Sequence, residues 1–203
     1  LATGLVVTIE ISLYSMLLTL ALGLLTALLR MSNSLSGQVL ARVYLETIRN
    51  TPMLVQIYVF YFVIAPVLGI DRFWTGVLCL GLFEGSFASE IIRAGINSVP
   101  RGQWEAGSSV GLSRFASYRY VVLPQAIPLM LPPMTGVLIN LIKHSAIVSV
   151  IAVFELTTEG RNIIADTYMA FEVWLTVAGI YLLLTVSLSI FVGYLERRLR
   201  QPS

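Results

Sequence analysis

Long apolar stretches separated by short polar segments dominate the pattern of hydrophobic and polar positions along this chain. A helix needs about 20 mostly apolar residues to cross a bilayer, so each stretch of this length predicts a membrane-spanning helix. The pattern predicts an all-α membrane protein whose five spans cover approximately residues 4–29, 52–68, 73–92, 126–154 and 173–194. We expect residues 1–203 to form one transmembrane domain.

Two of the spans have irregular starts or interiors. Thr51 followed by Pro52 predicts a helix start, because threonine caps helices and proline is tolerated in a first turn. The fourth span opens with several prolines and is interrupted near Lys143. A broken helix at membrane depth must be buried in protein or line an aqueous cavity. Alternatively, Lys143 extends to the membrane surface from the end of a shorter span.

Composition and charge agree with a membrane protein and orient it. Hydrophobic residues make up 57% of the chain and charged residues 12%, whereas soluble domains carry about 25% charged residues. Cytoplasmic loops collect arginine and lysine, and alternation of the spans places ten arginines on one side and two on the other. This distribution predicts an external N-terminus, a cytoplasmic C-terminus and a cytoplasmic segment over residues 97–123. The ten are Arg30, Arg42, Arg49, Arg93, Arg101, Arg114, Arg119, Arg197, Arg198 and Arg200, against Arg72 and Arg161.

Several function classes are excluded by residue content. The single cysteine, Cys79, cannot form an internal disulfide, and the single histidine, His144, cannot form a histidine-based metal site. The only lysine, Lys143, follows no glycine-rich loop, so the chain has no nucleotide-binding P-loop. We therefore expect this chain to bind no cofactor.

The cytoplasmic segment has the pattern of a helical hairpin. "QWEAGSSVGL" predicts a short helix that ends at Gly111, where glycine readily adopts a positive φ. Ser113 is then the predicted N-cap of a second short helix. The hairpin carries apolar side chains on a polar segment, which indicates a partner surface. These side chains are Trp104, Val110, Leu112 and Phe115.

The hairpin resembles the EAA loop of ABC importer permeases, in which a Glu-Ala pair is followed by a glycine six residues after the glutamate and by Leu-Pro at the next span. Here these are Glu105-Ala106, Gly111 and Leu123-Pro124. Five ordered blocks resemble the polar amino-acid (histidine/glutamine/arginine-type) branch of that family. They are "YLETIRNTPMLVQIYVFYF", "ASEIIRAGINSVPRGQWEAG", "LPQAIPLMLPP", "KHSAIVSVIAVFELT" and "YLERRLR".

The resemblance implies the type I importer permease fold with five spans, in a bacterial plasma (inner) membrane. It implies a cytoplasmic ABC ATPase dimer that carries ATP and Mg²⁺, a second permease subunit of the same or a homologous chain, and an extracytoplasmic amino-acid-binding protein. The EAA loop would be the coupling helix that inserts into the ATPase. Its residues here are Gly102, Trp104, Glu105, Ala106, Gly107, Gly111 and Leu112.

This chain departs from the family pattern at three places. The family usually has a second alanine where Gly107 stands, and an aspartate or asparagine where His144 stands. Residues often Thr-Ser-Leu in the family are here Ser145, Ala146 and Ile147. The departures near residue 144 affect which substrate contacts carry over.

Charged residues within the spans are the candidates for a translocation path. Glu84 lies deep in the third span, where a charge is costly and indicates function. We expect it to line the path with Lys143 and Ser145, or to pair with Lys143 of the same or the facing subunit. Glu90 and Arg93 are three residues apart on one helix face and predict a structural ion pair.

The sequence thus favours the transmembrane subunit of an ATP-driven importer of polar amino acids, without covalent chemistry of its own. One alternative is a channel or a proton- or ion-coupled carrier that uses Glu84, Lys143 and His144 as a relay. Another is an intramembrane enzyme or an assembly subunit. Nothing near Lys143 and Ser145 supplies an oxyanion hole, so a Ser/Lys nucleophile pair is disfavoured.

Overall fold

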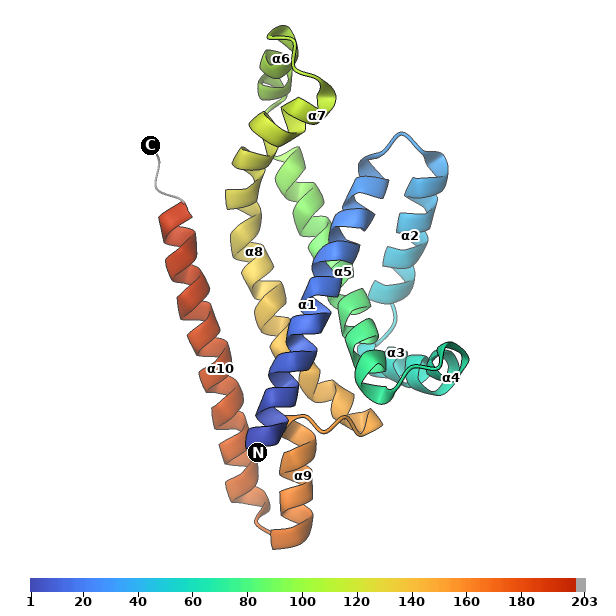
Figure 1. Cartoon of the computed structure of the whole chain (residues 1–203), viewed down its shortest axis with the longest axis vertical. Helices are drawn as coiled ribbons and strands as arrows, with labels where there is room; N and C mark the ends of the chain where they lie inside the picture. The colour runs from blue at the N-terminus through green and yellow to red at the C-terminus, as the bar shows by residue number, and fades with distance from the viewer. Residues whose placement is uncertain (200–203) are drawn as a thin grey trace.

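Long helical segments run along the long axis of the molecule (Figure 1). The computed structural model describes residues 1–199 of the chain, and this part consists of helices joined by short connections, with no strand. The elements are α1 (Ala2–Met31), α2 (Leu35–Arg49), α3 (Met53–Val59), η1 (Phe60–Ile64), α4 (Ala65–Leu68), α5 (Arg72–Asn97), α6 (Arg101–Ser109), α7 (Arg114–Ser117), η2 (Tyr118–Val122), α8 (Leu123–His144), η3 (Ser145–Ile151), α9 (Leu156–Thr167) and α10 (Ala170–Leu199).

The number of membrane spans in the described residues depends on one bent helix pair. Four helices are long and apolar enough to cross a membrane: Ala2–Met31, Arg72–Asn97, Arg114–Ile151 and Ala170–Tyr194. A fifth span results if α2 and the segment Met53–Leu68 count together, although a bend of 107° separates them. The N-terminus and the C-terminal end of α10 lie in opposite halves of the molecule (Figure 1).

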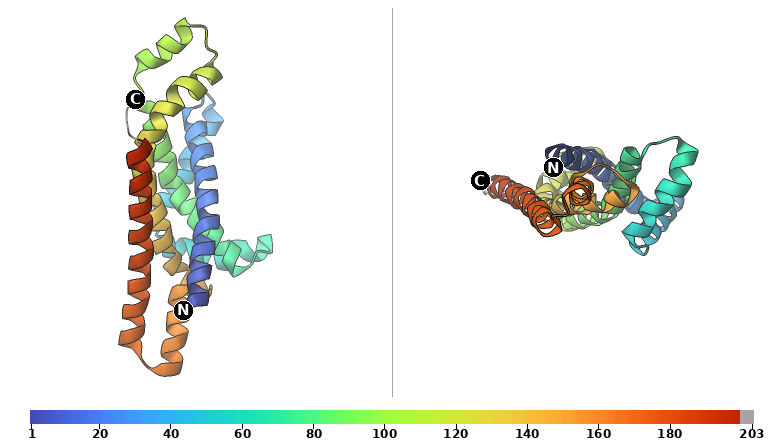
Figure 2. Two further views of the ribbon diagram at one scale, coloured as in Figure 1. Left: turned by 60° about the vertical axis from the view of Figure 1, so that its left-hand side comes forward. Right: turned by 90° about the horizontal axis from the view of Figure 1, so that it is seen from below.

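The segment 52–68 is not the straight second span that its composition predicts. α2 runs back from the α1–α2 turn along the bundle, and Met53–Leu68 then projects sideways as an arm (Figure 2). Pro52 is the N-cap, and the Thr51 hydroxyl donates to the Thr47 carbonyl at 2.7 Å instead of capping the arm. Arg42 and Arg49 consequently lie on a helix of the bundle rather than in a loop, which corrects their assignment to the cytoplasmic loops.

The contact between α1 and α5 is built from small residues. A Cβ on Gly23 would lie 2.8 Å from the Ala88 Cβ, and one on Gly81 would lie 2.6 Å from Leu18. Buried hydroxyls on α1 also reach backbone carbonyls of α5, with Ser15 donating to Val77 at 3.4 Å. Helices in lipid associate through this close backbone approach, since hydrophobic burial gives them no separate driving force.

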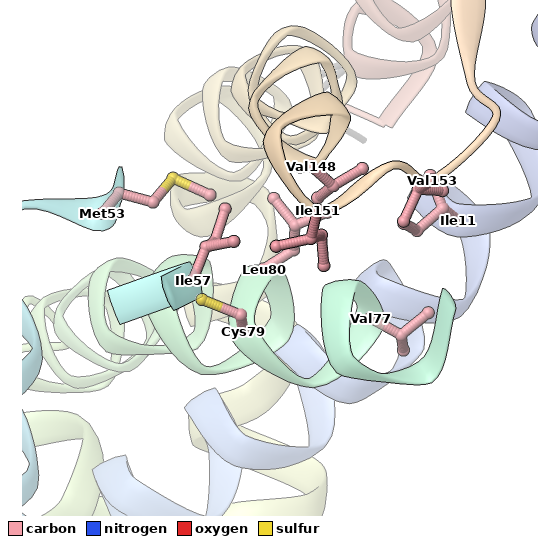
Figure 3. Packing of buried hydrophobic residues seen from close by; sticks show 9 residues of the cluster. All are labelled: Ile11, Met53, Ile57, Val77, Cys79, Leu80, Val148, Ile151 and Val153. Carbon is pink, nitrogen blue, oxygen red and sulfur yellow. The ribbon is translucent and has the colours of Figure 1, made fainter. Parts of the chain in front are cut away.

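An apolar cluster fixes the lower half of the bundle. Ile57 from the arm, Leu80 from α5 and Val148 from η3 are fully buried against one another (Figure 3). Ile11 of α1 belongs to the same cluster, so four segments distant in sequence meet there. The root of the arm is therefore anchored, although its tip carries exposed Phe62 and Val67.

The fourth span is longer and more continuous than its prolines predict. α7, η2, α8 and η3 follow one another without a loop from Arg114 to Ile151, so the span is not limited to residues from 126 onward. η2 is a π-helical turn whose last bond runs from Leu123 N–H to the Tyr118 carbonyl. The ring of Pro124 would crowd the carbonyl four residues earlier in a regular helix, and the wider turn gives it room. η1 precedes Pro66 in the same way.

A buried carboxylate starts α9 and ties it to α10. Glu155 is 0% exposed, and its two carboxylate oxygens accept the N–H groups of Thr157 and Thr158, each at 2.8 Å. The Tyr181 hydroxyl of α10 donates to the same carboxylate at 2.8 Å. Charge-assisted caps of this kind satisfy the free N–H groups at a helix start.

We predict that Glu155→Ala destabilises the protein by about 2 kcal/mol or more, because it removes a buried helix cap and leaves the part-buried Tyr181 hydroxyl with one fewer partner. The measurement is an unfolding titration in detergent micelles with increasing SDS. Glu172→Ala is the matched control, since Glu172 lies in the first turn of α10 and is exposed. Equal midpoints for the two variants would contradict a stabilising role for the Glu155 carboxylate.

Candidate functional site

The helical hairpin α6–α7 lies at one end of the molecule, beyond the ends of the long helices (Figure 1). Gly111 has φ +79° and forms the turn between the two helices. The Ser113 hydroxyl accepts the N–H of Ala116 at 3.2 Å and caps α7, as the sequence indicates. Local turn chemistry therefore determines the angle between α6 and the long fourth span.

The outward face of the hairpin carries the EAA residues. Gly102, Glu105 and Ala106 are exposed on α6, and a Cβ on Gly102 would meet no atom within 4 Å. Val110 and Phe115 are 75% and 79% exposed at the turn. Within the described residues Glu105 forms no ion pair with Arg101, so its carboxylate is available to a partner.

Trp104 has a different place from the one its sequence pattern predicts. It is partly buried and packs edge-on against Tyr118 with ring centroids 4.7 Å apart, within a cluster that includes the buried Val122. Its role here is to hold α6 onto η2, because an aromatic side chain contributes a large contact area. Leu112 is also partly covered, so the exposed apolar contacts of the turn are Val110 and Phe115.

The packing around Gly107 explains why this chain has a glycine where the family usually has a second alanine. Gly107 is buried against Ser117, and an added Cβ would lie 3.1 Å from the Ser117 Oγ. Glycine at this position lets α6 approach the C-terminal end of α7 closely. The departure thus belongs to the internal packing of the hairpin and leaves its outer face unchanged.

Within the bundle, Glu84 pairs with His144 and not with Lys143. Oε1 of Glu84 lies 2.6 Å from Nδ1 of His144, and the Glu84 side chain is only 2% exposed whereas that of His144 is 33% exposed. Phe83 packs edge-on against the same imidazole. A carboxylate this deep requires a polar partner, which the histidine supplies. The predicted Glu84–Lys143 pair within one chain is therefore corrected.

The other two predicted path residues differ in accessibility. Lys143 is exposed and forms no ion pair among the described residues. Ser145 is fully buried and its hydroxyl donates to the Ile142 carbonyl at 2.6 Å. Ser145 therefore presents no group to an open surface of this chain, and the accessible polar groups near the helix break are Lys143 and His144.

The change from α-helix to 3₁₀ helix after His144 is held by two arginines from other elements. α8 ends at His144 and η3 continues it as a 3₁₀ helix over Ser145–Ile151. Arg161 of α9 donates to the Ser149 carbonyl at 2.7 Å, and Arg72 of α5 donates to the Ala152 carbonyl at 2.9 Å. The Arg72 bond gives the Ala152 carbonyl a partner just after η3, whereas the Ser149 carbonyl also accepts the Ala152 N–H at 3.1 Å.

Glu90 accepts hydrogen bonds from Arg93 at 2.9 and 3.1 Å and is also the centre of a larger cluster. Arg30 at the end of α1 donates to its other oxygen, and Arg49 of α2 lies 3.5 Å from that oxygen. One carboxylate thus joins α1, α2 and α5 near the hairpin end of the bundle. The pairing with Arg93 follows the spacing in sequence, whereas the contributions of Arg30 and Arg49 depend on tertiary packing.

Comparison with known proteins shows which family has this arrangement. The family model described as "Binding-protein-dependent transport system inner membrane component" matches residues 19–201. The chain belongs to this family.

Relatives and a solved structure agree with the family assignment. The chain is 39% identical over 181 residues to the probable glutamine ABC transporter permease protein GlnM of Bacillus subtilis, covering 89% of this chain and 84% of GlnM. It is 38% identical over 200 residues to the glutamine transport system permease protein GlnP of Escherichia coli K12, covering 97% of this chain and 91% of GlnP. A crystal structure of an amino acid ABC transporter with histidines superposes with a TM-score of 0.88 at 37% identity, covering 97% of this chain and 92% of the solved chain.

The family assignment places the described geometry in an importer permease. Members of the family are membrane transport subunits of ABC importers and not catalytic enzymes. The all-helical chain with four or five candidate spans has the type I importer permease fold of its solved relative. The sequence did not predict two pairings within the bundle. These are the contact of Arg49 on α2 with Glu90, and the contact of His144 with Glu84. The signal for the second was the presence of the only histidine at a helix break.

Proposed function

We propose that this chain is a transmembrane subunit of an ATP-driven importer that moves glutamine or a similar polar amino acid into a bacterial cytoplasm. The observation that carries the proposal is the hairpin α6–α7 with exposed Glu105, Val110 and Phe115 at one end of the bundle. It supports docking on a separate cytoplasmic ATPase that holds ATP and Mg²⁺. The relatives named for glutamine support the substrate class.

Charge supports the proposed orientation, with the N-terminus outside and α6–α7 in the cytoplasm. Arg30, Arg93, Arg101 and Arg114 gather at the hairpin end, whereas Arg72 and Arg161 lie at the other end of the bundle. Arg200, which the sequence also assigns to the cytoplasm, lies outside the described residues. An extracytoplasmic binding protein would deliver substrate at the end that includes α9.

The sideways arm supports assembly with a second permease subunit of the same or a homologous chain. Leu54, Val55, Phe62 and Val63 are exposed along Met53–Leu68, and the arm extends away from the rest of the bundle (Figure 2). Exposed apolar side chains of this kind can pack closely against the helices of a neighbouring subunit. In a two-subunit assembly, motion of the ATPases would rock the two bundles between outward- and inward-facing states.

Uptake into proteoliposomes tests the proposal. The permease is reconstituted with its co-encoded ATPase and binding protein, and labelled glutamine is supplied outside with ATP inside. We expect uptake to require ATP hydrolysis and to stop with a hydrolysis-deficient ATPase. Uptake that persists with that ATPase and follows a proton gradient would instead identify the carrier that uses Glu84, Lys143 and His144.

We further predict that Glu84→Gln lowers substrate uptake about tenfold while leaving assembly with the ATPase unchanged. The amide can keep one hydrogen bond to His144 but removes the negative charge beside the accessible imidazole. Initial uptake rates and size-exclusion profiles of the complex measure the two effects. Ser86→Ala on the same buried helix is the matched control, since its hydroxyl bonds only within its own helix. Uptake kinetics equal to wild type in Glu84→Gln would remove Glu84 from the translocation path.

A further inference from the structure

A strongly basic pocket lies between the hairpin α6–α7 and the adjacent ends of α1 and α5. It has a volume of about 640 Å³, and its lining includes four guanidinium groups and no carboxylate. The four belong to Arg30, Arg93, Arg101 and Arg114, which come from four different helices. We call this site the basic pocket.

The charge of the basic pocket is only partly neutralised by the protein. Glu90, beside the pocket, bonds to Arg30 and Arg93 and also faces Arg49 outside the pocket, so one negative charge is shared by three arginines. Arg101 and Arg114 are exposed, and neither forms an ion pair among the described residues. Four positive charges therefore face a single carboxylate, and the two outer guanidinium groups remain available for an anion.

The depth of the basic pocket matches that of lipid headgroups. α1 and α5 contain 30 and 26 residues. At about 1.5 Å per residue, each is longer than the roughly 30 Å of the hydrocarbon core. Their ends at Met31 and Asn97, which line the pocket, thus reach the headgroup region. Trp104 and Tyr118 lie at the same level, where aromatic residues with a polar tip commonly occur in membrane proteins.

We propose that the basic pocket binds the phosphate group of an anionic phospholipid of the cytoplasmic leaflet. Guanidinium groups present paired N–H donors that match phosphate oxygens, and the partly exposed Met31 at the end of α1 also lines the pocket. Anionic lipids are attracted to basic sites at this surface of the membrane. A bound lipid would connect the hairpin to α1 and α5 without occupying the exposed Glu105 and Phe115, which do not line the pocket.

The test measures lipid binding and does not depend on transport. Full-length protein in mild detergent is titrated with phosphatidylglycerol or with zwitterionic phosphatidylcholine, and bound lipid is counted by native mass spectrometry. We expect tighter binding of phosphatidylglycerol. The double variant Arg101→Gln/Arg114→Gln should weaken that binding about tenfold or more, since each arginine near the surface contributes to anion affinity.

A matched double variant separates the basic pocket from general surface charge. Arg42→Gln/Arg119→Gln removes the same charge at exposed positions outside the basic pocket and should leave phosphatidylglycerol binding unchanged. Equal losses in the two double variants, or no preference for phosphatidylglycerol in the wild type, would overturn the proposal. Where the pocket double variant does not purify as a folded protein, Arg114→Gln alone replaces it, with a loss of about fivefold expected and an unchanged affinity counting against the site.

Inorganic phosphate distinguishes a lipid site from a site for a free anion. The lipid-stripped wild type is titrated with phosphate by calorimetry and compared with the pocket double variant. We expect no saturable heat in either, because the lipid's acyl contacts are missing. Saturable phosphate binding that is lost in the double variant would assign the pocket to a soluble anion and overturn the lipid assignment.

Discussion

Gly111→Val is expected to abolish ATP-driven uptake while the protein still inserts into the membrane. Gly111 has φ +79°, a conformation that a β-branched side chain adopts only under strain. The variant must change the turn, which moves Val110 and α6 relative to Phe115. Because these groups form the proposed ATPase contact, co-purification of the ATPase should be lost together with uptake.

Gly111→Asn is the matched control for this prediction. Asparagine tolerates a positive φ, and no atom lies within 4 Å of an added Cβ at this position. It should retain most of the uptake, and both variants should show wild-type size-exclusion profiles in detergent. Full uptake with Gly111→Val would show that the angle between α6 and α7 is not needed for coupling.

Gly23→Leu should prevent the chain from folding into its native bundle. An added Cβ at Gly23 would lie 2.8 Å from the Ala88 Cβ and 3.3 Å from the Ala88 carbonyl carbon and the Ser89 nitrogen, and the remaining leucine atoms would extend further into α5. Overpacking a tight contact costs roughly 1–3 kcal/mol of stability. The cost is high here because the α5 backbone cannot move aside as a flexible side chain can. We expect aggregation or loss of the monodisperse peak in fluorescence-detected size exclusion.

The control for Gly23→Leu is a glycine-to-leucine substitution at a position where the added side chain has open space. A Cβ on Gly179 of α10 would meet no atom within 4 Å, so Gly179→Leu should leave the peak in place. A folded and thermally stable Gly23→Leu protein would mean that α1 and α5 separate without loss of structure. The comparison isolates steric contact from the change in side-chain hydrophobicity, which is identical in the two variants.

The sequence predicted correctly those features that depend only on residues close together in the chain. The Glu90–Arg93 contact follows from a spacing of three, and the Ser113 cap from a serine beside a short helix. The sequence did not reveal α2, because it is only 15 residues long and carries Arg42, Glu46 and Arg49, so it lacks the length and hydrophobicity of a span. Its stability depends on contacts with α1 and α5, which no window along the chain contains.

Long-range pairings explain the remaining differences in the site. Glu84 and His144 are 60 residues apart, and the neighbouring Lys143 is the more usual partner for a carboxylate. Successive helical residues point about 100° apart, so the rotation of α8 decides which of the two side chains meets α5. Trp104 likewise changes from an outward contact to an inward one, because η2 places Tyr118 against it.

The unbroken run from Arg114 to Ile151 has a mechanical consequence. In the proposed importer, force applied at Phe115 would travel through one helical rod of about 45 Å before reaching His144, at about 1.5 Å per residue. A rod without an intervening loop converts a small tilt at one end into a larger displacement at the other. Among the described residues between Arg114 and His144, only the π-helical turn Tyr118–Val122 departs from α-helical pitch. It is therefore the place where the helix between the hairpin and the Glu84–His144 contact would bend.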